Sequence, residues 1–245
     1  MVELKLLKEV LDFSHEKITT IDFVTKEKSN SYSISIYCSL IELAKSFHTL
    51  IGCKEYTGSL SIYRTFLENY VELINLINDN KYLKHIELEF YEHKLRTLNS
   101  AEKGNVYLVS LLEFTGIEIP KNKLRINEIK QELGIKNKYR IKEKFSMANM
   151  LGEYEAVYTE LCSESHCNLG ALFSRHFEYD EENKQIGISI YNSDVADRYS
   201  YYICALAMQL IDAGIRVVSS LDPKLKPEFE AFKRSFDEQF MVINT

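Results

Sequence analysis

Hydrophobic residues recur every three or four positions over most of the chain, which is the spacing of one face of an α-helix. In segment 60–74, for example, the apolar residues fall in one broad arc when successive positions are placed ~100° apart. The same periodicity, with polar residues that can cap or end helices, predicts helices at residues 3–13, 32–52, 59–78, 82–99, 102–115, 124–133, 144–165, 194–219 and 225–241. The pattern therefore predicts a mainly α fold, a helical bundle of about eight or nine helices.

One region departs from the helical period. Residues 172–179 and 185–191 alternate between apolar and polar side chains, and the acidic run 180–183 between them is typical of a loop. This predicts one small β-hairpin near 172–191. Because an isolated two-stranded hairpin is only marginally stable in water, we expect it to pack on the helices or on a partner.

The rest of the chain shows no internal repeat, low-complexity tract or long linker. We therefore expect a single helical domain over residues 1–245, with the N-terminal helix (1–15) and the C-terminal helix (225–241) at its periphery. Nine glycines and three prolines provide few turns, which argues against an all-β fold. No apolar run approaches the ~20 residues that cross a bilayer, so no membrane partner is expected.

Cysteine usage indicates a reducing environment. The five cysteines form an odd set without a Cys-x-x-Cys pair, and the first residues resemble an amphipathic helix rather than a signal peptide. Both features favour a cytoplasmic protein with free thiols. The cysteines are Cys38, Cys53, Cys162, Cys167 and Cys204.

Charge is distributed unevenly along the chain. Segment 121–144 carries nine Lys and Arg against three Glu, a net +6, which leaves −12 for the remainder of a chain with a total of −6. A basic segment on an acidic body can attract the phosphate backbone, which makes RNA a candidate partner. The alternative is a solvated, lysine-rich helical connector, the more usual meaning of such a charge run.

The helix expected at 59–78 carries the first candidate site residues. Arg64 and Glu68 are i,i+4 neighbours on the margin of the apolar arc, where they can pair. A pair at the edge of a buried stripe is partly desolvated, so each charge needs a partner. It is either a structural ion pair that anchors two helices or a guanidinium placed for an anionic ligand.

His166 is the second candidate. Asn168 and Gly170 are helix stop signals, so His166 is expected in or just after the last turn of the preceding helix. The helix dipole there favours imidazolium, which suits a proton donor or an anion contact. The alternative is a histidine that caps carbonyl groups.

No metal or cofactor is expected. The sets Cys162/His166/Cys167 and His85/Glu89/His93 lack the four spaced ligands of a closed zinc site. A Cys162/His166 nucleophile pair has no third group to orient it. The glycine-rich phosphate-binding motifs of the common nucleotide-binding enzymes are also missing from the sequence.

Two segments resemble the signatures of a widespread prokaryotic family of unknown function. Segment 61–73 resembles its Leu-x-Arg-x-x-x-Glu helix, and segment 158–166 its Tyr-x-x-Leu-Ser/Cys-x-x-x-His motif. The order and separation of the motifs also fit, so the resemblance spans about residues 30 to 220. It implies an all-helical fold distantly similar to HEPN-type domains, which include metal-independent ribonucleases of toxin–antitoxin and phage-defence systems.

The HEPN resemblance implies catalytic roles for Arg64, Glu68 and His166. HEPN ribonucleases place Arg-x(4–6)-His on one helix, whereas here no arginine precedes His166 at that spacing and Arg175 and His176 are adjacent. Arg64 would therefore act from another helix, and we expect its guanidinium within about 8 Å of the His166 ring so that one phosphate could touch both. The competing hypothesis is a non-catalytic helical interaction module. In both cases we expect a homo-oligomer or a protein partner.

Overall fold

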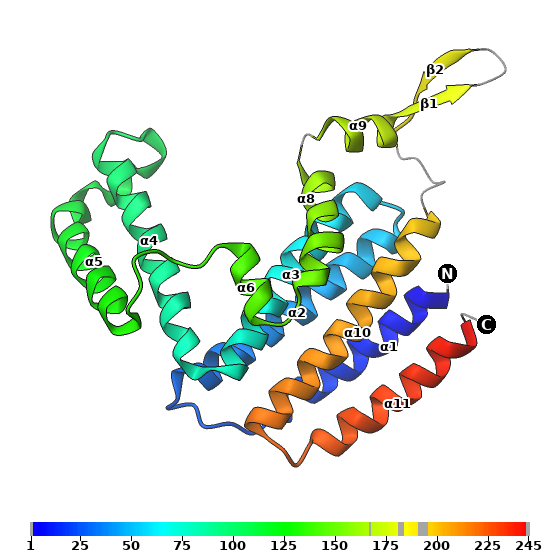
Figure 1. Cartoon of the computed structure of the whole chain (residues 1–245), viewed down its shortest axis with the longest axis horizontal. Helices are drawn as coiled ribbons and strands as arrows, with labels where there is room; N and C mark the ends of the chain where they lie inside the picture. Colours follow the sequence, from blue (N-terminus) through cyan, green and yellow to red (C-terminus); the bar gives the residue numbers. More distant parts are fainter. Residues whose placement is uncertain (1, 167, 181–183, 191–195, 244–245) are drawn as a thin grey trace. The chain divides into compact units, whose positions relative to one another are not determined.

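The computed structural model describes residues 2–166, 168–180, 184–190 and 196–243, and it confirms a mainly α protein (Figure 1). The described residues form ten helices when the continuous run Leu151–Ser165 is taken as one, more than the eight or nine expected. The chain forms two compact units where we expected one domain: unit 1 combines residues 1–77 and 144–245, and unit 2 comprises residues 78–143.

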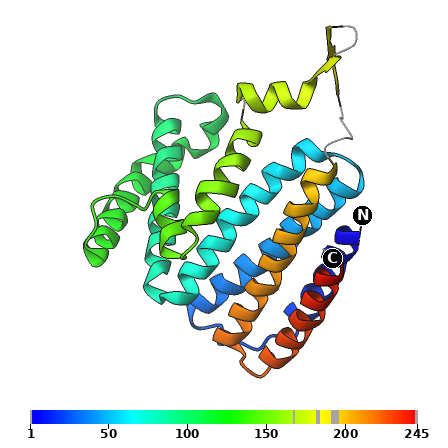
Figure 2. The same cartoon turned by 45° about the vertical axis from the view of Figure 1, so that its right-hand side comes forward.

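Five long helices make up most of unit 1. They are α1 (Val2–Ile18), α2 (Lys28–Gly52), α3 (Tyr56–Asn78), α10 (Ala196–Leu221) and α11 (Lys226–Ile243). Helix α10 contacts α1, α2 and α11, and the long helices lie side by side in Figure 2. We expected the N-terminal helix at the periphery, but α1 is part of the core, because its Leu7 and Val10 are fully buried.

Helix α10 is the central element of unit 1, and its packing depends on Gly214. A Cβ at this position would lie 2.5 Å from Cε1 of Phe229 and 2.6 Å from the hydroxyl of Tyr37. Only a residue without a side chain therefore allows α11 and α2 to approach α10 so closely. Segment Tyr199–Leu221 is also apolar and long enough to cross a membrane, contrary to our expectation, but 56% of its most apolar window is buried inside the protein. Core helices have the same composition, so the burial accounts for the hydropathy.

The remaining elements of unit 1 follow unit 2 along the chain. They are α6 (Ile141–Met147, which begins at the end of unit 2), α7 (Leu151–Glu153), the π-helical turn η3 (Tyr154–Tyr158), α8 (Thr159–Ser165), α9 (Leu169–His176), β1 (Phe177–Asp180) and β2 (Gln185–Ile188). Elements α7, η3 and α8 form one continuous helix. The π-helical turn inserts an extra residue into the helical register, a feature that is frequent at functional sites.

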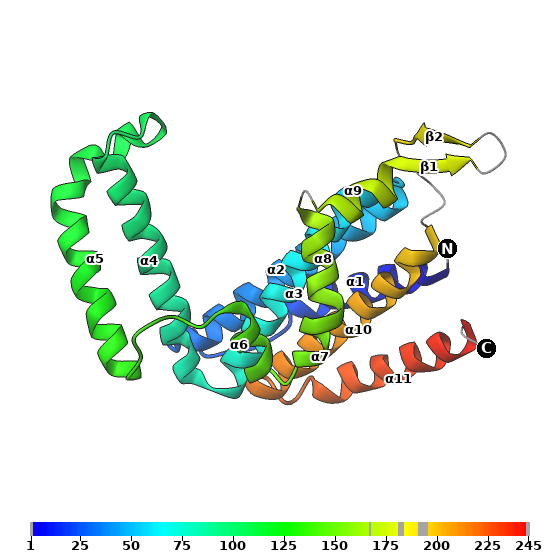
Figure 3. The ribbon, with the colours of Figure 1, turned by 45° about the horizontal axis from the view of Figure 1, so that its top comes forward.

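Unit 2 is an antiparallel pair of helices with short helical turns. It consists of η1 (Asn80–Tyr82), α4 (Leu83–Glu102), η2 (Val106–Leu111) and α5 (Leu112–Leu133), and Figure 3 shows α4 and α5 side by side. Leu88, Ile126 and Ile129 form its core. Six large apolar side chains near the η2 end remain exposed: Val106, Tyr107, Val109, Leu112, Phe114 and Ile117.

Three predicted elements have different boundaries, each for a local reason. The expected helix 102–115 is interrupted because Gly104 takes a left-handed conformation (φ 89°) that ends α4. The expected helix 144–165 is divided at Asn149, which has φ 58°. The expected strand 172–179 is helical up to His176, because the Asn168 side chain accepts a hydrogen bond from the Ala171 amide and so caps α9.

The β-hairpin itself is present but shorter than predicted. Strand β1 pairs antiparallel with β2, with Phe177 opposite Ile188 and Tyr179 opposite Ile186. Of the loop predicted at 180–183, Asp180 belongs to β1 and residues 181–183 lie outside the described residues. Residue 191 of the second predicted strand and the first two residues of the predicted helix 194–219 also lie outside them.

Candidate functional site

Arg64, Glu68 and His166 come together in unit 1, and a fourth residue, Tyr158, joins them. The Arg64 Nη1 lies 3.4 Å from His166 Nε2, well inside the 8 Å that we expected. The other terminal nitrogen, Nη2, lies 3.2 Å from Glu68 Oε1 and donates to the Tyr158 hydroxyl at 3.4 Å. We call these four residues the Arg64 cluster.

Helix periodicity places Arg64 and Glu68 on the edge of α3. The neighbouring residues Tyr63 and Phe66 are fully buried, whereas the Arg64 and Glu68 side chains keep 27% and 36% of their exposure. The ion pair is therefore at the rim of the core, reachable by solvent on one side. An anion could approach the guanidinium from that side without unfolding the helix.

Tyr158 holds the pair from the second segment. Its hydroxyl donates a 2.6 Å hydrogen bond to Glu68 Oε1, and its ring lies under the guanidinium at 5.6 Å from Arg64 Cζ. A short bond to a carboxylate is stronger than one between neutral groups, and the ring adds a cation–π attraction. Tyr158 thus connects the π-helical turn η3 to helix α3.

Tyr158 is the site residue that the sequence analysis missed. It stands at the first position of the Tyr-x-x-Leu motif, eight residues before His166, yet its helical face suggested only packing. Tyr158 is buried, and a buried tyrosine hydroxyl normally needs a polar partner. In the sequence, a tyrosine among the apolar residues of a predicted helix is therefore a signal for a polar partner, and Tyr158 offered that signal.

The electrostatics of the cluster keep Arg64 charged and Tyr158 protonated. The hydrogen bond with Tyr158 is the largest cause that raises the pKa of Arg64 further above its usual value; burial opposes it, and the charge of Glu68 adds a smaller increase. Burial, followed by the hydrogen bond to Glu68, raises the pKa of the Tyr158 hydroxyl. The cluster therefore presents a permanent cation that is held by a carboxylate and a neutral hydroxyl.

His166 lies at the end of α8, as expected. It is exposed, its backbone is extended (φ −113°, ψ 170°), and its N–H donates to Cys162 O at 3.2 Å. Because a guanidinium has only donors, a hydrogen bond between Arg64 and His166 uses the lone pair of Nε2 and makes that nitrogen the acceptor.

The guanidinium of Arg64 is not saturated by the protein. Its Nε–H is buried and has no hydrogen-bond acceptor among the residues that the structure describes. An arginine that served only as a structural clamp would be expected to have its buried donors satisfied. Cys162, half-buried one turn before His166, is a further neighbour of the guanidinium.

The two metal candidates find no support in the described parts of the chain. No group of three His, Cys, Asp or Glu residues that could hold a metal ion occurs there, and Cys167 lies outside the described residues. His85 instead stacks on Tyr139, with ring centroids 4.3 Å apart.

Ion pairs offset part of the positive charge of the basic segment 121–144. Lys121, Arg125, Lys130 and Lys144 each form an ion pair with a glutamate. In the loop after α5, Lys136, Lys138 and Arg140 are exposed at alternate positions of 136–140. These three side chains are the part of the segment best placed to meet an anion.

Comparison with known proteins places the chain in a family. It belongs to a family of unknown function, DUF5677, which matches residues 30–186 and so includes the whole Arg64 cluster. No curated protein and no solved structure matches the chain. The family description assigns no activity, so the function has to be argued from the site.

Proposed function

We propose that this chain is a HEPN-like, metal-independent RNA-cleaving protein of a toxin or phage-defence system, with Arg64, Glu68, Tyr158 and His166 as its site. One observation carries the proposal: an exposed imidazole lies 3.4 Å from a guanidinium that is itself anchored to a carboxylate. Such a pair offers a proton acceptor and a fixed positive charge within the span of one phosphate group.

The chemistry that fits this pair is attack of a ribose 2′-hydroxyl on the adjacent phosphorus. The 2′-hydroxyl displaces Arg64 Nη1 from His166 Nε2, and Nε2 then takes the hydroxyl proton while the O2′–P bond forms and the P–O5′ bond breaks. The leaving 5′-oxygen takes a proton from water, and the products are a 2′,3′-cyclic phosphate and a 5′-hydroxyl. His166 is then restored by releasing its proton to solvent, so no metal or other reactant is required.

Arg64 stabilises the negative charge that builds up on the phosphate oxygens in the transition state. Glu68 and Tyr158 act through Arg64: they are positioning residues that hold the guanidinium toward His166. Arginine from α3 and histidine from α8 thus replace the Arg-x(4–6)-His arrangement on a single helix.

The proposal is tested by incubating the full chain with a mixed RNA pool in EDTA. We expect cleavage that leaves 2′,3′-cyclic phosphate ends, and a loss of about 10²–10⁴-fold in rate for His166→Ala. His15→Ala is the matched control, because His15 is an exposed histidine on α1 of the same unit. Expression of the wild type should also slow growth, and expression of His166→Ala should not.

Two results would reject the catalytic proposal. Wild-type protein that leaves RNA intact with and without divalent ions would show that the cluster is not a nuclease site. Activity abolished by EDTA would require a metal and would contradict the mechanism above.

The second candidate is a non-catalytic interaction module. It is favoured by the exposed apolar side chains near η2 of unit 2, because contiguous apolar patches often mark protein-binding sites. In that case the Arg64 cluster only connects α3 to α8. The wild type and His166→Ala would then both leave the RNA pool uncleaved and have the same effect on growth.

A further inference from the structure

The β-hairpin of unit 1 exposes one entirely apolar face. Residues directly opposite each other in an antiparallel pair project to the same side, which places Phe177 and Tyr179 beside Ile188 and Ile186. These side chains keep 41%, 63%, 79% and 64% of their exposure, respectively. Four large apolar side chains on one side of two short strands are far more than a solvated hairpin requires.

Helix α9 extends this apolar face. The Phe173 ring, 52% exposed, packs on Phe177 with ring centroids 4.8 Å apart. We call Phe173, Phe177, Tyr179, Ile186 and Ile188 the hairpin face. On the other face of the hairpin, strand β2 carries Gly187 and Gln185, so only one face is apolar.

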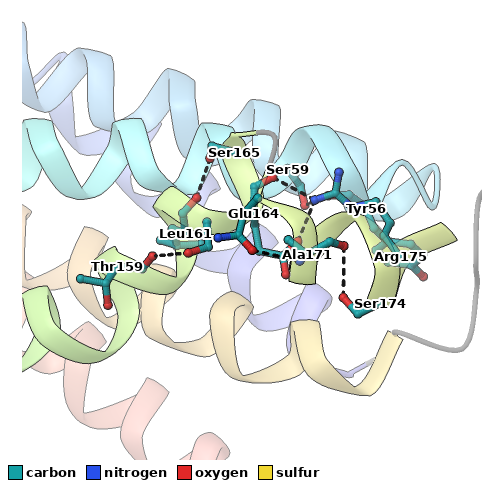
Figure 4. A network of polar contacts seen from close by, with 11 residues as sticks. Tyr56, Ser59, Thr159, Leu161, Glu164, Ser165, Ala171, Ser174 and Arg175 are labelled. Atoms are coloured by element: carbon teal, nitrogen blue, oxygen red, sulfur yellow. Dashed lines mark hydrogen bonds and ion pairs between the residues drawn. The ribbon is translucent and has the colours of Figure 1, made fainter. Parts of the chain in front are cut away.

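The hairpin face is fixed to the protein through α9. Arg175 donates to both the backbone oxygen and the carboxylate of Glu164 on α8, at 2.9 and 2.7 Å, and both side chains are largely buried (Figure 4). At the same C-terminal end of α9, the Ser189 amide donates to the His176 carbonyl at 2.9 Å, which extends the ladder of the hairpin. The face is therefore presented by a defined structure and not by a free loop.

The area of the hairpin face matches a small interface. Aromatic side chains bury ~150–250 Å² each, so five large side chains at these exposures present on the order of 500 Å². Two such faces together would bury about 1,000 Å², the lower bound of a specific protein–protein interface. Interfaces near this lower bound belong to weak, transient complexes, so we expect a reversible dimer.

We propose that the hairpin face is a dimerisation surface and that its partner is the hairpin face of a second copy of this chain. A two-stranded sheet needs a second layer to bury its apolar side, and an identical sheet packed ~10 Å away across a two-fold axis supplies one. Two-fold interfaces use the same patch on both subunits, and the hairpin face suits this because its five side chains carry no formal charge to repel one another.

The test is sedimentation velocity of the full chain from about 1 to about 100 µM. Wild type should form dimers across this range. The dissociation constant of the Ile188→Glu dimer should be at least tenfold higher, so this variant should be mainly monomeric, since its dimer would bury unpaired carboxylates. Gln185→Glu is the matched control: it adds the same charge to the same strand on the other face and should still form dimers. Circular dichroism should show the wild-type helical content in both variants.

Hydrogen exchange locates the contact independently of any variant. The amides of 185–190 should become more protected as the wild-type concentration rises. A monomeric wild type, a wild-type dimer without this protection, or an Ile188→Glu dimer of wild-type affinity would overturn the proposal. A monomer that binds phosphatidylglycerol vesicles through the hairpin would also overturn it, in favour of a membrane surface. None of these results bears on RNA cleavage, so the proposed function is tested separately.

Discussion

Removing one hydroxyl, in Tyr158→Phe, tests how the Arg64 cluster is held together. The substitution deletes the 2.6 Å hydrogen bond to Glu68 and the 3.4 Å contact with Arg64 but keeps the ring under the guanidinium. Hydrogen bonds to charged groups contribute ~1.5–3 kcal/mol. Because the Glu68 side chain is 36% exposed and water can replace the hydroxyl, we discount this range to about 1–2 kcal/mol of unfolding free energy.

The measurement is urea unfolding followed by circular dichroism, with Tyr201→Phe as the matched control. Tyr201 is an exposed tyrosine of α10 in the same unit, and loss of its hydroxyl should change stability by less than about 0.5 kcal/mol. A double-mutant cycle of Tyr158→Phe with Glu68→Gln should give a coupling of about 1 kcal/mol. Equal stability of the two Phe variants, or a cycle without coupling, would refute the role of Tyr158 as the link between η3 and α3.

Three further predictions concern other parts of the chain. Gly214→Ala should lower the unfolding free energy by about 1–3 kcal/mol through overpacking. Gly116→Ala, at a position of α5 with open space around it, should raise the unfolding free energy by about 0.5–1 kcal/mol in the same urea assay. A change of the same sign in both variants would contradict the close packing of α10 at Gly214. Burial and then the charge of Lys8 lower the pKa of His48 below its usual 6.5, so the unfolded chain binds the proton more readily and the unfolding free energy should fall as the pH drops through 6.5. His48→Asn should flatten this dependence of the unfolding free energy on pH between about pH 7 and 5. An unchanged slope would show that His48 is not the group responsible. If RNA meets the three exposed cations of loop 136–140, the logarithm of its affinity should fall with the logarithm of salt at a slope of about −2, and binding without salt dependence would leave the loop a solvated connector.

Periodicity predicted the helical class and the Arg64–Glu68 pair, because both depend on the local 3.6-residue repeat. It could not detect positions where the backbone leaves that repeat. The left-handed turns at Gly104 and Asn149 divide two predicted helices. At 172–176 the apolar residues fit either a strand or a short helix, and the Asn168 cap decides for the helix.

The candidate site needed information that the local pattern lacks. Arg64 and His166 are 102 residues apart in the sequence, and their contact depends on how α8 packs on α3. The expectation that they meet rested on their positions at the margins of two predicted helices, together with the family resemblance.

NMR of the histidine rings tests directly whether Arg64 and His166 contact the same anion. Inorganic phosphate is added to the full chain at constant pH and ionic strength, with chloride as the control anion. We expect the ring signals of His166 to shift saturably in the wild type, the shift to be lost in Arg64→Gln, and the signals of His15 not to move. Ring signals of His166 that ignore phosphate, or that shift equally with and without Arg64, would contradict the shared site.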